Sequence, residues 1–385
     1  MKPEEFNGKA GNVSMSSKGP YFVFTPKSLP QSIIYNDELV ALLSSANRAI
    51  GNLNGLLQQL PNPYLISRPY MKKEAVVSSR IEGTYSSLSD VVVKEATGQK
   101  DEPDKNKDLQ EVMNYNTALE NAIKAVNEQQ NITFDCIISM HSTLLTNTRG
   151  YDKDPGKLRV VQNWLGENQQ TPLIEARFVP PEPEAVKPLL INLLDYLAAN
   201  DGIDPLVKIG IAHYQFETIH PFRDGNGRVG RLILLLYLIK NKVISHPALS
   251  PSVYLERNRG DYYDALLNVS KKGEYEKWLG FFLKGIIVQS EDAIARINRL
   301  AEYRNKCRQQ LKEFRASKTA YDVLELLFDN PAIYVPQASA KLGVSYPPVN
   351  NAVKLMVEGG ILTEVTGWGR NRVFVAGEIL KIVGE

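Results

Sequence analysis

Residues 220–231 of the chain read His220-Pro221-Phe222-Arg223-Asp224-Gly225-Asn226-Gly227-Arg228-Val229-Gly230-Arg231. This stretch lies between two strongly apolar segments, residues 206–216 before it and residues 232–239 after it. Apolar residues recur at helical spacing in the first segment, and the second is apolar on almost every side, as in a buried helix. The pattern therefore predicts a polar loop that ends in the first turn of a buried helix.

The loop has the residue types of an anion-binding site. Gly225, Asn226 and Gly227 let the backbone adopt positive φ and turn successive N–H groups inward. The helix N-terminus that follows adds its partial positive charge. Arg228 and Arg231 are three residues apart, so both project from the same side of the first turn. We therefore expect this stretch to bind a polyphosphate.

Two side chains beside this anion-binding turn indicate that the stretch is catalytic. Asp224 has the hard oxygen that Mg²⁺ prefers when phosphate oxygens and water supply the remaining ligands. His220 is the natural general base, because imidazole is the group in this stretch whose pKa lies near neutrality. The chain has four histidines, and their positions do not have the spacing of a zinc site.

The complete stretch resembles the signature of the Fic (filamentation induced by cyclic AMP) family, and every diagnostic position is matched. Members of that family mostly transfer AMP from ATP to a hydroxyl group of a target protein. The resemblance implies that His220 deprotonates this hydroxyl, while Asp224 holds Mg²⁺ against the α- and β-phosphates. It also implies a nucleotide-binding set, with Phe222 as a core anchor of the loop and Tyr263 near the adenine base: Phe222, Arg223, Asp224, Gly225, Asn226, Gly227, Arg228, Arg231 and Tyr263.

A second informative stretch covers residues 71–83, which read as a helix with Gly83 as a left-handed C-cap. Glu82 then lies in the last turn, where the helix dipole disfavours a carboxylate, so we expect a cation nearby. A solvated surface glutamate is the alternative. The spacing Ser78-x-x-x-Glu82-Gly83 resembles the inhibitory motif of Fic proteins. This resemblance implies that Glu82 pairs with Arg231 and that ATP then binds unproductively.

Residues 158–179 change character from the helical segments around them. The strand-like runs 158–161 and 176–179 flank a polar segment, which predicts a β-hairpin with a long polar tip. This hairpin resembles the flap of Fic proteins, which registers an extended target segment by strand addition. The resemblance implies docking at Val160, Val161 and Phe178. A plain surface hairpin is the alternative.

The C-terminal segment predicts a third kind of structure. Helices over residues 319–328, 335–342 and 347–358, followed by a hairpin within 361–375, resemble a winged helix with Arg370 and Arg372 on its wing. From Lys318 onward, however, there are six Lys or Arg and seven Asp or Glu residues. A DNA-binding domain usually has a basic face, so DNA binding is not favoured. We favour protein docking or formation of a homodimer.

The composition narrows the class of protein. Of 385 residues, 43% are hydrophobic and 23% are charged, as in ordinary globular proteins. The formal net charge of +2 predicts no general attraction to nucleic acid or to a membrane. Two cysteines, Cys136 and Cys307, form no disulfide framework, and no apolar leader follows residues 1–5. These features predict a cytoplasmic protein.

We therefore expect a mostly α-helical Fic-type protein in four parts. These are an N-terminal arm and helical region (1–125), a catalytic core with the flap (126–300), a helical connector (301–317) and a winged-helix-like domain (318–385). The expected function is Mg²⁺-dependent AMP transfer from ATP to a Ser, Thr or Tyr hydroxyl of a target protein, restrained by Glu82. The alternatives are AMP removal or phosphoryl transfer on the same core, and a nucleotide-sensing DNA-binding regulator.

Overall fold

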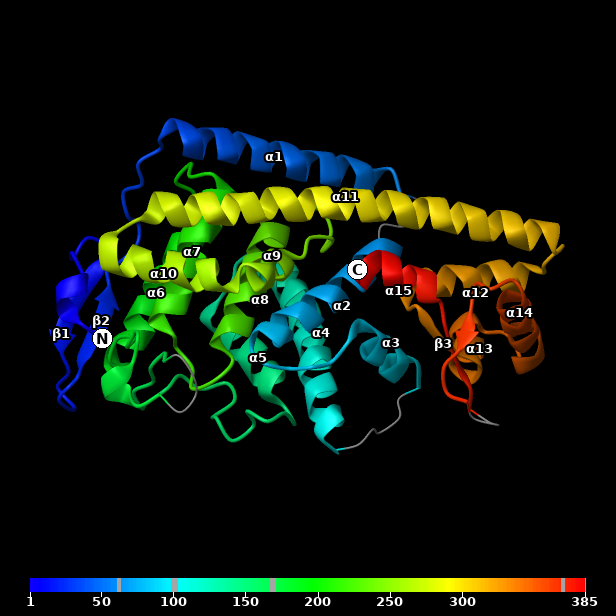
Figure 1. Ribbon diagram of the computed structural model, residues 1–385, viewed down its shortest axis with the longest axis horizontal. Helices are drawn as coiled ribbons and strands as arrows, with labels where there is room; N and C mark the ends of the chain where they lie inside the picture. Colours follow the sequence, from blue (N-terminus) through cyan, green and yellow to red (C-terminus); the bar gives the residue numbers. More distant parts are fainter. Residues whose placement is uncertain (61–63, 98–102, 167–170, 368–370, 385) are drawn as a thin grey trace. The chain divides into compact units, whose positions relative to one another are not determined.

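A computed structural model describes residues 1–60, 64–97, 103–166, 171–367 and 371–384 (Figure 1). The chain divides into two compact units whose segments alternate along the sequence. The first unit comprises residues 1–50, 114–244 and 251–288, and the second comprises residues 51–113, 245–250 and 289–385. Three helices have residues in both units: α1 (Asp37–Gln58), α4 (Pro103–Gln129) and α11 (Tyr275–Glu313). The division into four parts that the sequence suggested was drawn by expected function and not by contacts, and it stays a prediction.

The first unit is mostly helical, with one small antiparallel sheet. Its strands are β1 (Gly11–Met15) and β2 (Phe22–Pro26). Its complete helices are α5 (Phe134–Leu145), α6 (Pro183–Ala198), α7 (Pro205–Ile219), α8 (Asn226–Lys240), α9 (Pro251–Arg257) and α10 (Arg259–Lys272). Two short 3₁₀ turns, η1 (Pro3–Glu5) and η2 (Leu173–Glu175), complete the unit.

Helices α7 and α8 form the buried centre of the first unit and pack against each other. Asp204 begins α7, because its Oδ1 accepts the N–H of Leu206 at 2.8 Å and Pro205 fits the first helical position. Helix α7 ends at Ile219 with His220 as its C-cap, and α8 begins after Gly225, whose φ is +79°. Both helices are buried on nearly every side, which confirms the predicted polar loop between two buried helices.

The N-terminal arm that the sequence predicted contains a β-hairpin. Strands β1 and β2 pair antiparallel, with Gly11 opposite Pro26 and Met15 opposite Phe22. The hairpin is held to the chain near residue 179, since the N–H of Phe24 donates to the carbonyl of Val179 at 2.9 Å. The pairing of β1 with β2 was not predicted, because this contact with a segment far along the chain, rather than local strand propensity, orders residues 11–26.

The predicted hairpin over residues 158–179 is also wrong in its strands. Pairing is reduced to one bridge, in which the N–H of Leu165 donates to the carbonyl of Phe178 at 2.8 Å and that of Phe178 donates back at 3.1 Å. Val160 and Val161 lie outside any strand. The stretch after Phe178 has β2 as its neighbour instead of the predicted partner strand. Residues 167–170, at the predicted tip, lie outside the described residues.

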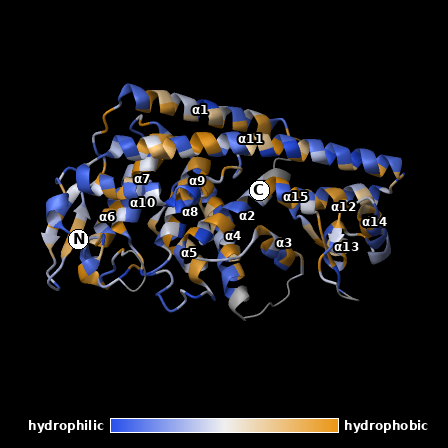
Figure 2. Ribbon diagram, in the orientation of Figure 1, coloured by the Kyte–Doolittle hydropathy of each residue, from blue (hydrophilic) through white to orange (hydrophobic). Residues whose placement is uncertain are grey.

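The second unit combines α2 and α3 with the C-terminal segment. Its complete helices are α2 (Tyr64–Ile81), α3 (Leu88–Thr97), α12 (Lys318–Asp329), α13 (Val335–Leu342), α14 (Tyr346–Glu358) and α15 (Gly377–Gly384). Its strands β3 (Ala332–Tyr334), β4 (Thr363–Glu364) and β5 (Val373–Val375) form an antiparallel sheet in the order β3-β5-β4. The predicted helices and the hairpin of β4 and β5 are confirmed here, while Arg370 lies outside the described residues. In Figure 2 the C-terminal half of α11 is mostly hydrophilic.

The second unit has a shared apolar core. Helix α3 contributes Val92 and Ala96, which pack with Ala332, Val373 and Val375 from the sheet. Helix α2 packs against α12 and α15. It begins at Tyr64 rather than at residue 71, because Pro69, which lies inside the helix, does not end it. Across the part of the chain that the structure describes, no helix is long and apolar enough to cross a membrane.

Ion pairs reinforce the contact between α2 and the C-terminal helices. Asp329 Oδ1 lies 2.6 Å from Arg68 Nη1 of α2, and Asp329 Oδ2 lies 2.8 Å from Lys341 Nζ of α13. Burial alone would raise the pKa of Asp329, but the hydrogen bonds from Lys341 and Arg68 outweigh it and lower this pKa from its ordinary value. The ionised carboxylate therefore stabilises the folded unit.

We predict that Asp329→Asn lowers the free energy of unfolding at pH 7 by about 1–3 kcal/mol, because a buried carboxylate with two cationic partners is lost. A group with a lowered folded pKa stabilises the protein above its unfolded pKa, so the difference from wild type should shrink below about pH 4. Urea unfolding at both pH values measures this. Glu358→Gln, an exposed change on α14, is the matched control. Equal losses for the two variants would contradict the assignment.

Candidate active site

His220 occupies the turn between α7 and α8. Its backbone is left-handed, with φ +49° and ψ +61°, a conformation that costs a residue other than glycine about 1–3 kcal/mol. Its ring Nδ1 lies 3.2 Å from the carbonyl oxygen of Glu217. Since a carbonyl oxygen only accepts, Nδ1 carries the hydrogen in this contact and the lone pair is on Nε2. This is the tautomer that a general base at Nε2 requires.

The loop after His220 is closed by one side chain. Asn226 Oδ1 accepts the N–H of Phe222 at 2.8 Å, and Asn226 Nδ2 donates to the carbonyl of Phe222, also at 2.8 Å. Phe222 is fully buried, and its ring stacks on that of His141 with centroids 3.7 Å apart. Phe222 is therefore the core anchor of the loop, and the Asn226 amide serves the loop backbone.

His141 on α5 positions the next residue of the loop. Its Nδ1 accepts the N–H of Gly156 at 2.9 Å, so its Nε2 carries the hydrogen that is donated to the carbonyl of Asp224 at 3.0 Å. Burial lowers the pKa of His141 to about 4. The ring is therefore neutral near pH 7, and it acts as a fixed support rather than as a base.

Asp224 has the properties of a ligand for Mg²⁺. Its Oδ1 accepts the N–H of Gly225 at 2.5 Å and lies 3.4 Å from Arg228 Nη2, while the side chain is 41% exposed. A side chain at Gly150 would come within 2.6 Å of Oδ2, so a glycine is needed for this approach. Among the described residues, no group of three or more His, Cys, Asp or Glu could hold a metal. A single, partly exposed carboxylate suits Mg²⁺ that takes its other ligands from phosphates and water.

Two of the three arginines of the motif are buried. Arg228 and Arg231 both lie on the first turns of α8 with almost no exposed surface. Arg223 is partly exposed, and its Nη1 pairs with Asp154 Oδ2 at 2.7 Å. Near Arg231 lies His213, whose pKa is lowered to about 3 by burial and by the charge of Arg231. The structure therefore concentrates positive charge at the start of α8 without an additional imidazolium.

Tyr263, the residue expected near adenine, lies on α10. Its ring is 5.7 Å from the guanidinium carbon of Arg259 and remains partly exposed. The adjacent Tyr262 is buried, and its hydroxyl is 2.8 Å from His213 Nε2. Tyr262 therefore belongs to the core of the first unit, and the role of Tyr263 at the base stays a prediction.

The remaining predicted residues differ in exposure. Val160 and Val161 are 80% and 51% exposed, whereas Phe178 is buried and its main-chain N–H and carbonyl are both bonded to Leu165. Docking at Val160 and Val161 stays a prediction, and Phe178 has its main chain committed to the fold. In the second unit, Ser78 is buried on α2.

Glu82 directly follows α2, which ends at Ile81 rather than at residue 83. Gly83, at φ +95°, takes the left-handed conformation that was predicted for it. Glu82 and Arg231 belong to different units. Their pairing stays a prediction.

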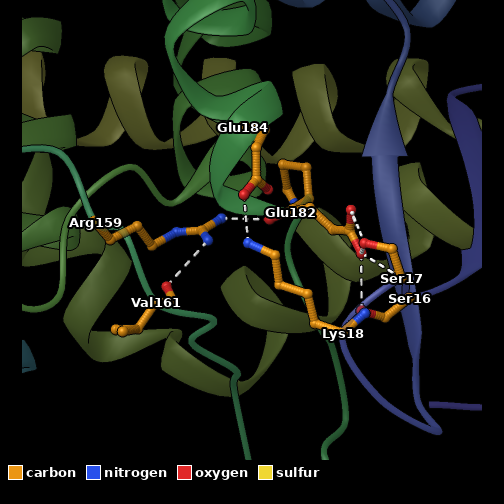
Figure 3. A network of polar contacts seen from close by, with 8 residues as sticks. Ser16, Ser17, Lys18, Arg159, Val161, Glu182 and Glu184 are labelled. Carbon is orange, nitrogen blue, oxygen red and sulfur yellow. Dashed lines mark hydrogen bonds and ion pairs between the residues drawn. The ribbon is translucent and has the colours of Figure 1, made fainter.

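Arg159 and Asn163 contact the loop of residues 220–225 between α7 and α8, although the sequence did not single them out. Arg159 is 2% exposed, and its Nε donates to the carbonyl of His220 at 2.9 Å. Asn163 Nδ2 donates to the carbonyl of Phe222, also at 2.9 Å. Figure 3 shows the guanidinium of Arg159 with its neighbours Val161, Glu182 and Glu184. A lone arginine in a strand-like run resembles a surface residue, so the sequence held no signal for this contact.

Comparison with protein families finds a match to part of each unit. A model described as the Fic/DOC family matches residues 131–238, and one described as Fic/DOC family N-terminal matches residues 40–124. Protein adenylyltransferase Fic-1 of Caenorhabditis elegans is 32% identical over 161 residues, which are 41% of this chain and 28% of that protein. Protein adenylyltransferase Fic of Nematostella vectensis is 28% identical over 170 residues, 42% of this chain and 35% of that protein. The match thus spans about a third or less of these relatives.

Solved structures share the fold. A Fic family protein from Desulfovibrio desulfuricans G20 superposes with a TM-score of 0.58 at 21% identity, covering 90% of this chain and 98% of that one. Fic-1 of C. elegans gives 0.54 at 22% identity, covering 68% of this chain and 74% of that one. These likenesses establish a mostly helical Fic fold with small antiparallel sheets. Together with the two matched family models, they show that the chain belongs to the Fic/DOC family, whose relatives include protein adenylyltransferases.

Proposed function

We propose that the protein transfers AMP from ATP to a Ser, Thr or Tyr hydroxyl of a target protein. The observation that carries this proposal is the placement of His220 immediately before a glycine-rich turn that opens a helix with two buried arginines. The similarity to protein adenylyltransferases supports it. The complete phosphate-binding stretch favours AMP transfer over AMP removal or phosphoryl transfer on the same core.

His220 acts as the general base. Its Nε2 accepts the proton of the target hydroxyl while the hydroxyl oxygen bonds to the α-phosphorus of ATP and the bond to pyrophosphate breaks. The contact between Nδ1 and the carbonyl of Glu217 keeps the lone pair on Nε2. His141 cannot replace His220 as the base. Its pKa of about 4 makes it a weak base, and both of its ring nitrogens are already hydrogen-bonded to the main chain.

The start of α8 binds the phosphates. Gly225 gives the turn its left-handed conformation, and its own N–H is bonded to Asp224 Oδ1. The N–H of Gly227, in the first turn of α8, faces the anion, while Arg228 contacts the β-phosphate and Arg231 the γ-phosphate. Both arginines are buried before any ligand arrives, so they need little reorganisation during the reaction. Asp224 would hold Mg²⁺, and the ion would neutralise phosphate charge there. Tyr263 lies against the adenine base.

Regulation and target docking complete the proposal. Glu82, supported by the buried Ser78, forms an ion pair with Arg231 at rest and so competes with the γ-phosphate for the same guanidinium. The exposed Val160 and Val161 dock an extended segment of the target. The C-terminal segment, as a winged-helix domain, docks a protein or forms a homodimer in the cytoplasm.

The test of this function uses full-length Glu82→Gly protein with ATP labelled at the α- or the γ-phosphate. AMP transfer places label on protein only from α-labelled ATP. Label from γ-labelled ATP alone would establish phosphoryl transfer instead. Loss of label from a previously modified target, without any gain, would establish AMP removal.

We predict that His220→Ala lowers the single-turnover rate of AMP transfer by about 10²–10⁴-fold, the usual contribution of a general base. ATP affinity, measured by calorimetry, should be unchanged because the phosphates are held by α8 and the glycine turn. His246→Ala, which removes a histidine outside this loop, is the control. Wild-type turnover in the His220→Ala protein would remove His220 from the role of base.

We predict opposite effects for Glu82→Gly and Arg231→Ala, although both delete the same proposed ion pair. Glu82→Gly should raise the transfer rate by about 5–150-fold, the range of a typical regulatory coupling. Arg231→Ala should give no gain, because it also loses the γ-phosphate contact. Glu82→Gln keeps the size of the side chain without its charge and should give part of the gain. An unchanged rate for Glu82→Gly would refute autoinhibition.

We predict that Val160→Pro impairs modification of a folded target, because strand addition needs main-chain donors and proline has none. Val160→Ala removes most of the side chain but keeps the N–H, so it should modify the target at nearly the parental rate. Initial rates with the folded target and with a flexible peptide are compared. Equal rates for Val160→Pro and the parent on both substrates would show that this segment does not dock the target.

A further inference from the structure

The guanidinium of Arg159 lies at the junction of three chain segments. Its Nε donates to the carbonyl of His220 at 2.9 Å, and its Nη2 donates to the carbonyls of Pro181 at 2.6 Å and Ile219 at 3.4 Å. Its Nη1 donates to the carbonyl of Val161 at 3.4 Å. One side chain thus joins the end of α7, the start of α6 and the segment proposed to dock the target.

The main chain of Arg159 also bonds the loop that follows α7. Its N–H donates to the carbonyl of Pro221 at 2.9 Å, so residues 220 and 221 are both bonded to this one residue. Asn163, four residues later, donates to the carbonyl of Phe222. The segment 159–163 is therefore hydrogen-bonded along residues 220–222: Arg159 supplies two of these bonds, and Asn163 supplies two, the second being to the carbonyl of His220 at 3.4 Å.

The charge of Arg159 is not neutralised by a direct ion pair within the part of the chain that is described. The two nearby carboxylates are engaged elsewhere, as Figure 3 shows: Glu184 pairs with Lys18, and Glu182 accepts hydrogen bonds from Ser16 and Ser17. Burial lowers the pKa of Arg159 to about 10, so the side chain is still charged near pH 7. Among the described residues, every hydrogen bond of the guanidinium is accepted by a main-chain carbonyl.

A buried charge without an ionic partner is costly, and an apolar side chain of similar volume often stabilises a core as well or better. Stability alone is therefore a poor reason for an arginine at this position. The planar guanidinium offers five donors in a fixed arrangement, which suits several carbonyls that must keep one relative geometry. The carbonyls of Ile219 and His220 also lie at the C-terminus of α7, where a cation is favourable.

We propose that Arg159 is a positioning residue, which fixes the main chain of His220 relative to the docking segment at Val160 and Val161. The imidazole of His220 then keeps a fixed position relative to the hydroxyl of a docked target. The expected effect on kcat rests on the proposed transfer reaction. The hydrogen bonds from Arg159 to the main chain do not depend on it, because they lie within the first unit. Arg159 acts through the backbone of His220 and does not touch ATP.

The test compares Arg159→Met and Arg159→Lys with Val186→Ala, all in full-length Glu82→Gly protein. Methionine keeps a long side chain but removes all donors, and lysine keeps the charge without the planar fork. Val186 is a buried residue of α6, so its truncation destabilises the same unit without removing any hydrogen bond to residues 219–222. The variants are compared by hydrogen exchange and by steady-state kinetics.

Arg159→Met should lower kcat for transfer by about 10²-fold, the cost of a misplacement of roughly 1 Å, and leave the KM and the calorimetric Kd for ATP unchanged. Amide exchange should rise together at Leu165 and Phe222, one on each side of the link. Arg159→Lys should recover part of both effects, and Val186→Ala should show neither. A merely structural arginine would affect ATP binding, or would be matched by Val186→Ala.

Parental kcat in Arg159→Met, or unchanged exchange at Leu165 and Phe222, would overturn the inference. So would an equal loss of kcat in Val186→Ala at the same loss of stability. A failure of the proposed function is recognised separately, as absence of label from α-labelled ATP in the Glu82→Gly parent. In that case a joint rise of exchange at the two amides still supports the link, and its absence overturns it.

Discussion

The amide of Asn226 bonds both the N–H and the carbonyl of Phe222, and the geometry of the site depends on this double contact. It closes the chain between α7 and α8, so that His220 must turn through a left-handed conformation immediately before it. The contact is buried, and water does not compete with it. Only a side chain with both a donor and an acceptor serves, so aspartate, which has the same shape, would lose half of the closure.

Other polar side chains around the loop also bond its main chain. His141, Arg159 and Asn163 all bond main-chain carbonyls of residues 219–224 rather than other side chains. Each of them is at least partly buried and carries a cost that a purely structural core would avoid. This concentration of buried polar side chains around one loop is expected where a protein uses stability to fix a reacting geometry. The loop is thus supported from α5 and from the segment after residue 158.

The sequence predicted the parts of the fold whose signals are local. Helices α7 and α8 and the glycine turn between them followed from apolar spacing and from the backbone freedom of glycine, and α12 to α14 were placed within a residue or two. Strand β1 was missed because its order comes from pairing with β2, and α2 was started too late because Pro69 interrupted its pattern. Arg159 was not identified as a support, and His141 was expected to be structural but without its partner, because the carbonyls that they bond are 61 and 83 residues away. The strand at residues 158–161 was predicted from propensity alone, whereas the main chain of Arg159 bonds Pro221 in the loop between α7 and α8.

The core shared by α3 and the C-terminal sheet has a consequence for synthesis of the protein. Val92 and Ala96 are made early, but their packing partners Ala332, Val373 and Val375 leave the ribosome more than two hundred residues later. The first unit has all of its segments by residue 288, so it can fold while the apolar sides of α2 and α3 still lack their partners. The segment that carries Glu82 is therefore among the last that can reach its final structure.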